Sequence, residues 1–141
     1  MTAYNPREFP LNPGERPVLG RRSSMAMTIT ERRVGDVTVL QLGGRIVFGD
    51  GASELRARLN DLLDEARLKF LLDLREVTYI DSFGVGVIAA KFVSVRRKGG
   101  DMKLLRLSAR THRVMTISGL LKIFQSFESE EDGVRSFATK A

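Results

Sequence analysis

The sequence predicts one α/β domain: a mixed β-sheet that starts with a hairpin, continues with alternating strands and helices, and is covered by about four helices. Three observations predict this fold class. Two β-rich runs come first, separated by a turn pair. Strand-like and helix-like segments then alternate, and the helix-like segments carry apolar residues at helical spacing. A length of 141 residues suits one domain with a modest extension.

The start of the chain differs in composition from the rest. Residues 1–24 contain all four prolines and show no sustained hydrophobic period. We therefore expect residues 1–27 to form a flexible tail and residues 28–141 to form the folded domain.

The domain is predicted to begin with a β-hairpin. Thr28–Val34 and Val37–Leu42 are rich in β-formers and are joined by Gly35-Asp36, a turn pair. A loop is then predicted by four glycines: Gly43, Gly44, Gly49 and Gly51.

Helix, strand and helix are expected next. An amphipathic helix is predicted by residues at the spacing i, i+4, i+7, i+8 and i+11: Leu55, Leu59, Leu62, Leu63 and Ala66. Lys69–Arg75 holds a continuous apolar run, typical of a strand buried on both faces. The segment from Val85 to Val95 is apolar almost all round, which predicts a helix packed into the core and ending at Gly99-Gly100.

The last part of the domain repeats this alternation. Met102–Leu107 is predicted to be a strand, and Ser108 to cap a helix that runs to Gly119 with Val114 and Ile117 facing inward. Lys122–Phe127 is a short strand candidate. Ser129 and Asp132 resemble a capping box before a final helix, whose apolar face holds Val134, Phe137 and Ala138.

Composition excludes several classes of function. The chain has no cysteine, so disulfides, thiolate zinc sites and a cysteine nucleophile are absent. Charges such as Asp73 and Asp81 interrupt the apolar runs, and the N-terminus lacks a signal-peptide core. We expect a cytoplasmic protein without membrane insertion.

The positive charge of the chain is spread along it. The formal net charge is +6 and the pI is about 10.2. The only dense cluster is Arg96-Arg97-Lys98, at a predicted helix end where cations suit the helix dipole. Aromatic residues are not interleaved with basic ones, so a solvated basic face is favoured over direct nucleic-acid binding.

The most informative segment is the junction after the central strand. A buried strand leads to Asp81-Ser82, where a helix begins, so backbone N–H groups and the positive end of the helix dipole point at this turn. A phosphate on Ser82 would be tolerated there and would add about −1.5 to −2 charges. Gly84 and Gly86 leave the helix start open to another backbone. The alternative is that Asp81 and Ser82 only cap the helix and the glycines only ease packing.

The segment from Val77 to Gly86 resembles the signature of STAS domains of the anti-sigma-factor antagonist class. In that signature, a strand ending in Leu-x-Val-x-x-Ile/Met is followed by Asp-Ser-Ser/Thr-Gly-x-Gly. Further equivalents are Asp73-Leu74, Arg97-Lys98-Gly99-Gly100, Ile117-Ser118-Gly119-Leu120 and Phe124. The resemblance covers residues 28–141 and implies the STAS fold.

The resemblance also implies a function. Proteins of this class bind an anti-sigma factor, often a serine kinase, and are released when the kinase phosphorylates the serine after the motif aspartate, here Ser82. A metal-dependent serine phosphatase resets the cycle. The protein is then a substrate and not an enzyme, and no cofactor or metal is expected. The expected partner-binding residues are Asp81, Ser82, Phe83, Gly84 and Gly86, and a homodimer is left open.

One residue departs from the family pattern. Phe83 stands where many members have serine or threonine. It is either a contact anchor for a partner or a core residue of the first helical turn, and we favour the core. The loop Arg45–Gly51 is expected near the same end of the sheet, where it would add contact surface.

The sequence allows three other interpretations. Gly84-Val85-Gly86-Val87-Ile88-Ala89 fits G-x-G-x-x-A of dinucleotide enzymes, but it follows the third predicted strand, and no acidic residue ends the next strand. A pair of Ser82 with the only histidine, His112, has no third orienting group to support it. The remaining alternative is a STAS subunit of a stressosome-like scaffold or of a membrane lipid-transport complex, without sigma-factor control.

Overall fold

The computed structural model describes residues 15–16 and 27–138. Most of the expected tail, residues 1–14 and 17–26, lies outside the described residues, as do residues 139–141. Within the tail, Glu15–Arg16 form a short strand, β1, that the sequence did not predict. Met27 is buried and already belongs to the next strand.

The sheet has six strands in the spatial order β1-β2-β3-β4-β5-β6. After β1, the strands are β2 (Met27–Val34), β3 (Val37–Ile46), β4 (Lys69–Ile80), β5 (Asp101–Leu105) and β6 (Ser126–Phe127). The first two pairs are antiparallel, and the pairs from β3 to β6 are parallel. The predicted mixed sheet with a hairpin start is therefore confirmed.

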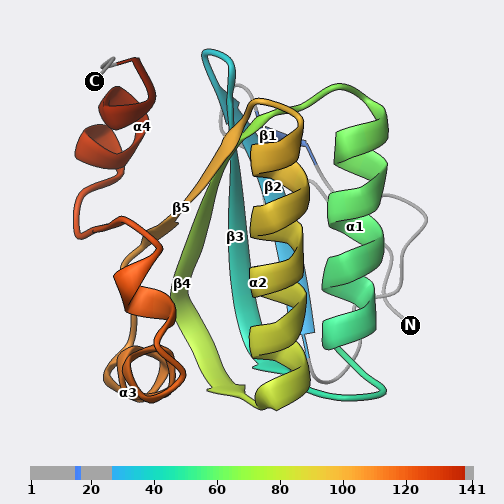
Figure 1. Ribbon diagram of the computed structural model, residues 1–141, viewed down its shortest axis with the longest axis vertical. Helices are drawn as coiled ribbons and strands as arrows, with labels where there is room; N and C mark the ends of the chain where they lie inside the picture. The colour runs from blue at the N-terminus through green and yellow to red at the C-terminus, as the bar shows by residue number, and fades with distance from the viewer. Residues whose placement is uncertain (1–14, 17–26, 139–141) are drawn as a thin grey trace, which may run out of the picture.

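Helices connect the parallel strands. They are α1 (Ala52–Asp64), α2 (Ser82–Arg97), α3 (Ala109–Ile117) and α4 (Glu130–Ala138), with a 3-10 turn η1 at Leu120–Lys122. Figure 1 shows α1 and α2 side by side in front of the sheet, with α3 and α4 beyond β5. Within the described part of the chain, no helix is long and apolar enough to cross a membrane.

The hairpin turn follows from its glycine. Gly35 has φ 62°, and Val34 lies opposite Val37. A positive φ at the first central residue is what a type II′ turn requires, and glycine adopts it without strain. The turn pair predicted by the sequence is confirmed.

Two cores lie on opposite faces of the sheet. The larger core lies beneath α1 and α2, and the leucine stripe of α1 is buried in it as predicted. Ala66 is the exception, because it lies beyond the end of α1 with φ 62°. The smaller core lies beneath α4, where Phe137 packs with Leu71 and Leu105.

The central strands are longer than the sequence predicted. β3 continues through Gly43-Gly44 to Ile46, because β4 pairs with it along that stretch, with Gly43 opposite Glu76. A Cβ at Gly43 would lie 2.9 Å from Oγ1 of Thr28, so glycine is needed inside the strand here. The expected loop is therefore confined to the residues after Ile46.

Several predicted orientations are wrong. α2 is not buried all round, because it lies on the surface of the sheet beside α1 and leaves Val93 45% exposed. Ile117 is 80% exposed, and Met115 is the apolar residue of α3 that is buried instead. β5 ends at Leu105 because Arg106 has φ 53°.

The C-terminal part matches the prediction more closely. Only Ser126–Phe127 of the candidate strand over residues 122–127 form a strand, β6, and Lys122 ends η1. Ser129 caps α4, since its Oγ accepts a hydrogen bond of 3.3 Å from Asp132 N. Gly133 lets α4 approach the sheet closely, because a Cβ there would lie 3.0 Å from Leu71.

Candidate functional site

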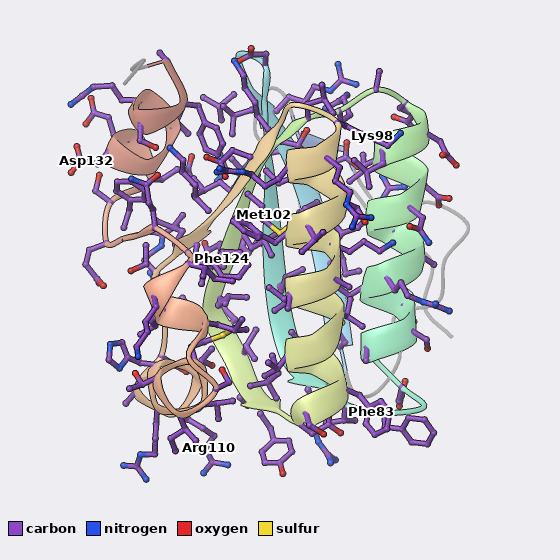
Figure 2. All side chains as sticks on the ribbon, in the orientation of Figure 1. Phe83, Lys98, Met102, Arg110, Phe124 and Asp132 are labelled. Carbon is purple, nitrogen blue, oxygen red and sulfur yellow. The ribbon has the colours of Figure 1, made fainter. Side chains whose placement is uncertain are left out.

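The predicted site lies where the parallel strands β3 and β4 end and α2 begins. Ile46 and Ile80 are register partners at the ends of these strands, and Asp81 N donates a hydrogen bond of 3.3 Å to Ile46 O. Figure 2 shows Phe83 at this end of α2 and Lys98 at the opposite end. The fold thus brings the loop after β3 next to the start of α2, as expected from the sequence.

Asp81 joins these two segments through its carboxylate. Oδ1 accepts hydrogen bonds from Phe83 N at 2.9 Å and Gly84 N at 3.0 Å, which caps α2. Oδ2 accepts a hydrogen bond of 2.9 Å from Phe48 N, which ties down the loop. The capping role considered for Asp81 is therefore observed, and the side chain also holds a second segment.

These hydrogen bonds keep Asp81 ionised. Partial burial alone would raise the pKa of Asp81, but the backbone N–H groups of Phe48, Gly84 and Phe83 outweigh burial and lower the pKa below its ordinary value. The carboxylate therefore carries its charge at neutral pH, directly beside Ser82.

Ser82 is exposed at the first position of α2. Its hydroxyl has no hydrogen-bond partner among the described residues. The first-turn N–H groups that could have held a phosphate are used by Asp81 instead. A phosphate on Ser82 would thus lie in solvent beside the negative charge of Asp81. The helix dipole would offset only part of the repulsion between these two negative charges.

Two exposed phenylalanines lie at the start of α2, where Ser82 is found. Phe83 is 54% exposed, so the favoured interpretation of Phe83 as a core residue is wrong. Its ring lies 4.4 Å, centroid to centroid, from the ring of Phe48, which is 68% exposed. Phe83 points outward, whereas the next residue, Gly84, is buried against the ends of β3 and β4.

Sequence reasoning did not single out Phe48. It lies in the loop flagged as contact surface, and an aromatic residue before Gly49 and Gly51 was the available signal. Its pairing with Phe83 depends on the tertiary structure.

The two motif glycines have different surroundings. A Cβ on Gly84 would clash with Ile46 O and lie 2.7 Å from Cγ1 of Ile80, so this glycine lets the chain's own strand approach. Gly86 is exposed, and a Cβ there would meet nothing within 4 Å.

The geometry of the site does not support dinucleotide binding, a Ser82–His112 pair or a metal site. The N–H groups that a dinucleotide phosphate would use are bonded to Asp81. His112 is exposed on α3, where its Nδ1 lies 3.5 Å from Thr116 Oγ1, and it makes no hydrogen bond with Ser82. No group of three potential metal ligands was found among residues 15–16 and 27–138.

Comparison with known proteins identifies the family. Residues 28–133 match the model of the STAS domain, so the chain belongs to the STAS domain family. The resemblance of the segment from Val77 to Gly86 to the STAS signature is thus confirmed.

Two of the similar curated proteins are anti-sigma factor antagonists. The chain is 36% identical over 84 residues to the anti-sigma-B factor antagonist of Bacillus subtilis, covering 60% of this chain and 76% of the relative. It is 27% identical over 95 residues to the anti-sigma F factor antagonist of Paenibacillus polymyxa, covering 67% and 80%. Both relatives are therefore named anti-sigma factor antagonists.

The fold agrees with a solved structure. The crystal structure of an anti-sigma factor antagonist from Mycobacterium paratuberculosis matches with a TM-score of 0.73 and 19% identity, covering 84% of this chain and 100% of that one. At this identity the likeness concerns the fold.

Proposed function

We propose that this protein is an anti-sigma factor antagonist that binds an anti-sigma factor with serine kinase activity and is released when Ser82 is phosphorylated. The observation that carries the proposal is the exposed Ser82 hydroxyl, which has no hydrogen-bond partner among the described residues. It directly follows the ionised cap Asp81 and precedes the exposed Phe83, whose ring contacts that of Phe48. Similarity to the Bacillus subtilis antagonist supports the class of partner. A serine phosphatase would restore the binding form, and we place the cycle in the cytoplasm.

The local surface suits a charge-controlled interface. Phe48 and Phe83 offer apolar contact area, and aromatic residues commonly anchor protein interfaces. Gly86 would let a partner backbone approach the first turn of α2. A phosphate beside Asp81 would place about two further negative charges in this contact area, where desolvating them is costly.

Mass spectrometry tests the modification. The protein is incubated with ATP and a candidate anti-sigma factor kinase, and the intact mass and peptides are measured. We expect a single phosphate on Ser82, and no phosphate on the Ser82→Ala variant. A phosphate that maps to another residue, or persists in Ser82→Ala, contradicts the proposal.

A matched pair of variants tests the charge mechanism. Ser82→Asp and Ser82→Asn have side chains of nearly equal size and differ in charge. We expect Ser82→Asp to bind the kinase at least about tenfold more weakly than Ser82→Asn, because like charges and desolvation oppose the contact. Ser82→Ala should stay bound in the presence of ATP. Equal affinities of the Asp and Asn variants would argue against a charge switch.

The same experiments address the other role considered for this fold. Tight binding to a scaffold or transporter subunit, together with absence of phosphorylation by any candidate kinase, would favour a structural STAS subunit.

A further inference from the structure

A groove lies beside the last part of β4, where this strand has no neighbouring strand on the β5 side. β4 pairs with β5 only as far as Asp73, but it continues to Ile80 beside β3. Beyond Asp73 the N-terminus of α3 takes the place of β5, since Ser108 Oγ donates a hydrogen bond of 3.4 Å to Val77 O. The groove therefore runs along an extended backbone and has a volume of about 720 Å³.

Three arginines from three different elements line this groove. Arg45 comes from β3, Arg75 from β4 and Arg110 from α3. The ring of Tyr79 lies between two of them, with the Arg45 guanidinium 5.8 Å and the Arg110 guanidinium 5.9 Å from its centroid. Arg45 and Tyr79 are register partners in the parallel pair of β3 and β4.

The charge of the groove is only partly balanced. Arg75 pairs with Glu76 at 3.3 Å, in an exposed pair that contributes little. Arg45 and Arg110 form no ion pair with any of the described residues. Three guanidinium groups thus face one carboxylate, and guanidinium forks are well suited to carboxylate ligands.

We propose that this groove binds an extended acidic segment of a protein partner. Carboxylates of the segment would pair with Arg45 and Arg110, while its apolar side chains would contact the exposed ring of Tyr79. An extended ligand fits because the neighbouring backbone is itself a strand without a partner strand at this edge.

The groove suits other ligands less well. No polar side chain that lines the groove is buried, so a small oxyanion bound there would remain largely in solvent. Tyr79 is the single aromatic residue of the groove, and both flanking arginines already contact it, so base stacking is not favoured.

The groove opens at the same end of the molecule as Ser82. Figure 2 shows Arg110 and Phe83 at this end, with α3 and α2 contributing one each. A partner that covers the Phe83 region could therefore extend an acidic segment into the groove, although the groove does not depend on phosphorylation of Ser82.

Fluorescence anisotropy tests the proposal with a labelled hexapeptide that alternates acidic residues and valine. At low ionic strength, we expect the double variant Arg45→Gln/Arg110→Gln to bind the peptide about tenfold more weakly than the wild type. The control Arg97→Gln/Arg135→Gln has the same net charge and should bind within about twofold of the wild type. A peptide with amides in place of the carboxylates should not bind.

Amide chemical shifts of the wild-type chain locate the binding site independently of any variant. Addition of the acidic peptide should shift the amides of Val77, Thr78 and Tyr79. Shifts scattered over the basic surface, or equal losses in the two double variants, would show unspecific attraction and overturn the proposal. Displacement of the peptide by millimolar inorganic phosphate, or by duplex DNA at lower concentration, would assign the groove to another ligand and also overturn it.

Discussion

At the start of α2, two adjacent side chains point to different surroundings. The Asp81 carboxylate accepts three backbone hydrogen bonds, whereas the Ser82 hydroxyl faces solvent. The glycines that follow differ in the same way, because Gly84 is buried against Ile46 and Gly86 is exposed. Some residues of one short motif therefore hold the fold, while others face solvent.

The two glycines provide a prediction at this scale. Gly84→Ala should lower the free energy of unfolding by about 2 kcal/mol, because the new methyl group would clash with Ile46 O and Ile80. Gly86→Ala should raise it by up to about 1 kcal/mol, because alanine favours the helix and meets no neighbour. Urea denaturation measures both changes.

The binding of the partner separates the two roles further. Gly86→Ala should weaken binding to the kinase, if a partner backbone approaches the first turn of α2 as proposed. A Gly86→Ala variant with wild-type affinity would remove Gly86 from the interface, and a Gly84→Ala variant with wild-type stability would contradict the close approach.

At the scale of elements, α2 and the loop after β3 depend on one carboxylate. Asp81 caps the helix and accepts a hydrogen bond from Phe48 N, so the two exposed rings share an anchor. Loss of this carboxylate should loosen the loop as well as the helix end.

Asp81→Ala is expected to lower the free energy of unfolding by about 1 to 2 kcal/mol and to shift the amide resonance of Phe48. Ser129→Ala is the matched control, because it removes the cap of α4 at a similar cost and should leave the Phe48 amide unchanged. An unshifted Phe48 amide in Asp81→Ala would show that the loop does not need the carboxylate.

The Asp81 carboxylate also predicts a pH dependence of the stability of this site. The pKa of Asp81 lies below its unfolded value of 3.8, so its stabilising contribution is fully present above pH 3.8 and is lost as the pH falls through the lower, folded pKa. The Phe48 amide should therefore titrate below pH 3.8. A titration midpoint above this value would contradict the assignment.

At the scale of the whole molecule, charged side chains join the sheet to α4. Arg106 donates a hydrogen bond of 2.8 Å to the buried carboxylate of Asp73, and lies 3.7 Å from Glu130 at the start of α4. Arg32 of β2 also bonds Glu130 and, by this hydrogen bond, lowers the pKa of Glu130. The network links β2, β4 and α4, which are distant in sequence.

Removal of the central cation should destabilise the whole domain. Arg106→Met keeps most of the stem but leaves the Asp73 carboxylate buried without its cation, so we expect a loss of about 2 to 4 kcal/mol in the free energy of unfolding. Arg135→Met removes only exposed ion pairs on α4 and should cost less than about 0.5 kcal/mol. Equal losses in the two variants, measured by urea denaturation, would show that the network adds no more than surface pairs do.

The sequence alone predicted the alternation of elements, the hairpin turn, the leucine stripe of α1 and the junction at Asp81-Ser82, because periodicity, turn chemistry and capping are local signals. Prediction from the sequence failed where the pairing of strands overrides the local preference of the residues. β3 runs through Gly43-Gly44 because β4 continues beside it. The exposure of a residue such as Ile117 depends on which neighbours cover its helix.

Only the tertiary structure decided how distant residues combine at the candidate site. The contact between Phe48 and Phe83, the double role of Asp81 and the arginines around Tyr79 join residues from separate elements. Such juxtapositions leave no periodic trace in the chain, because they arise from the order of the strands and from where each strand ends.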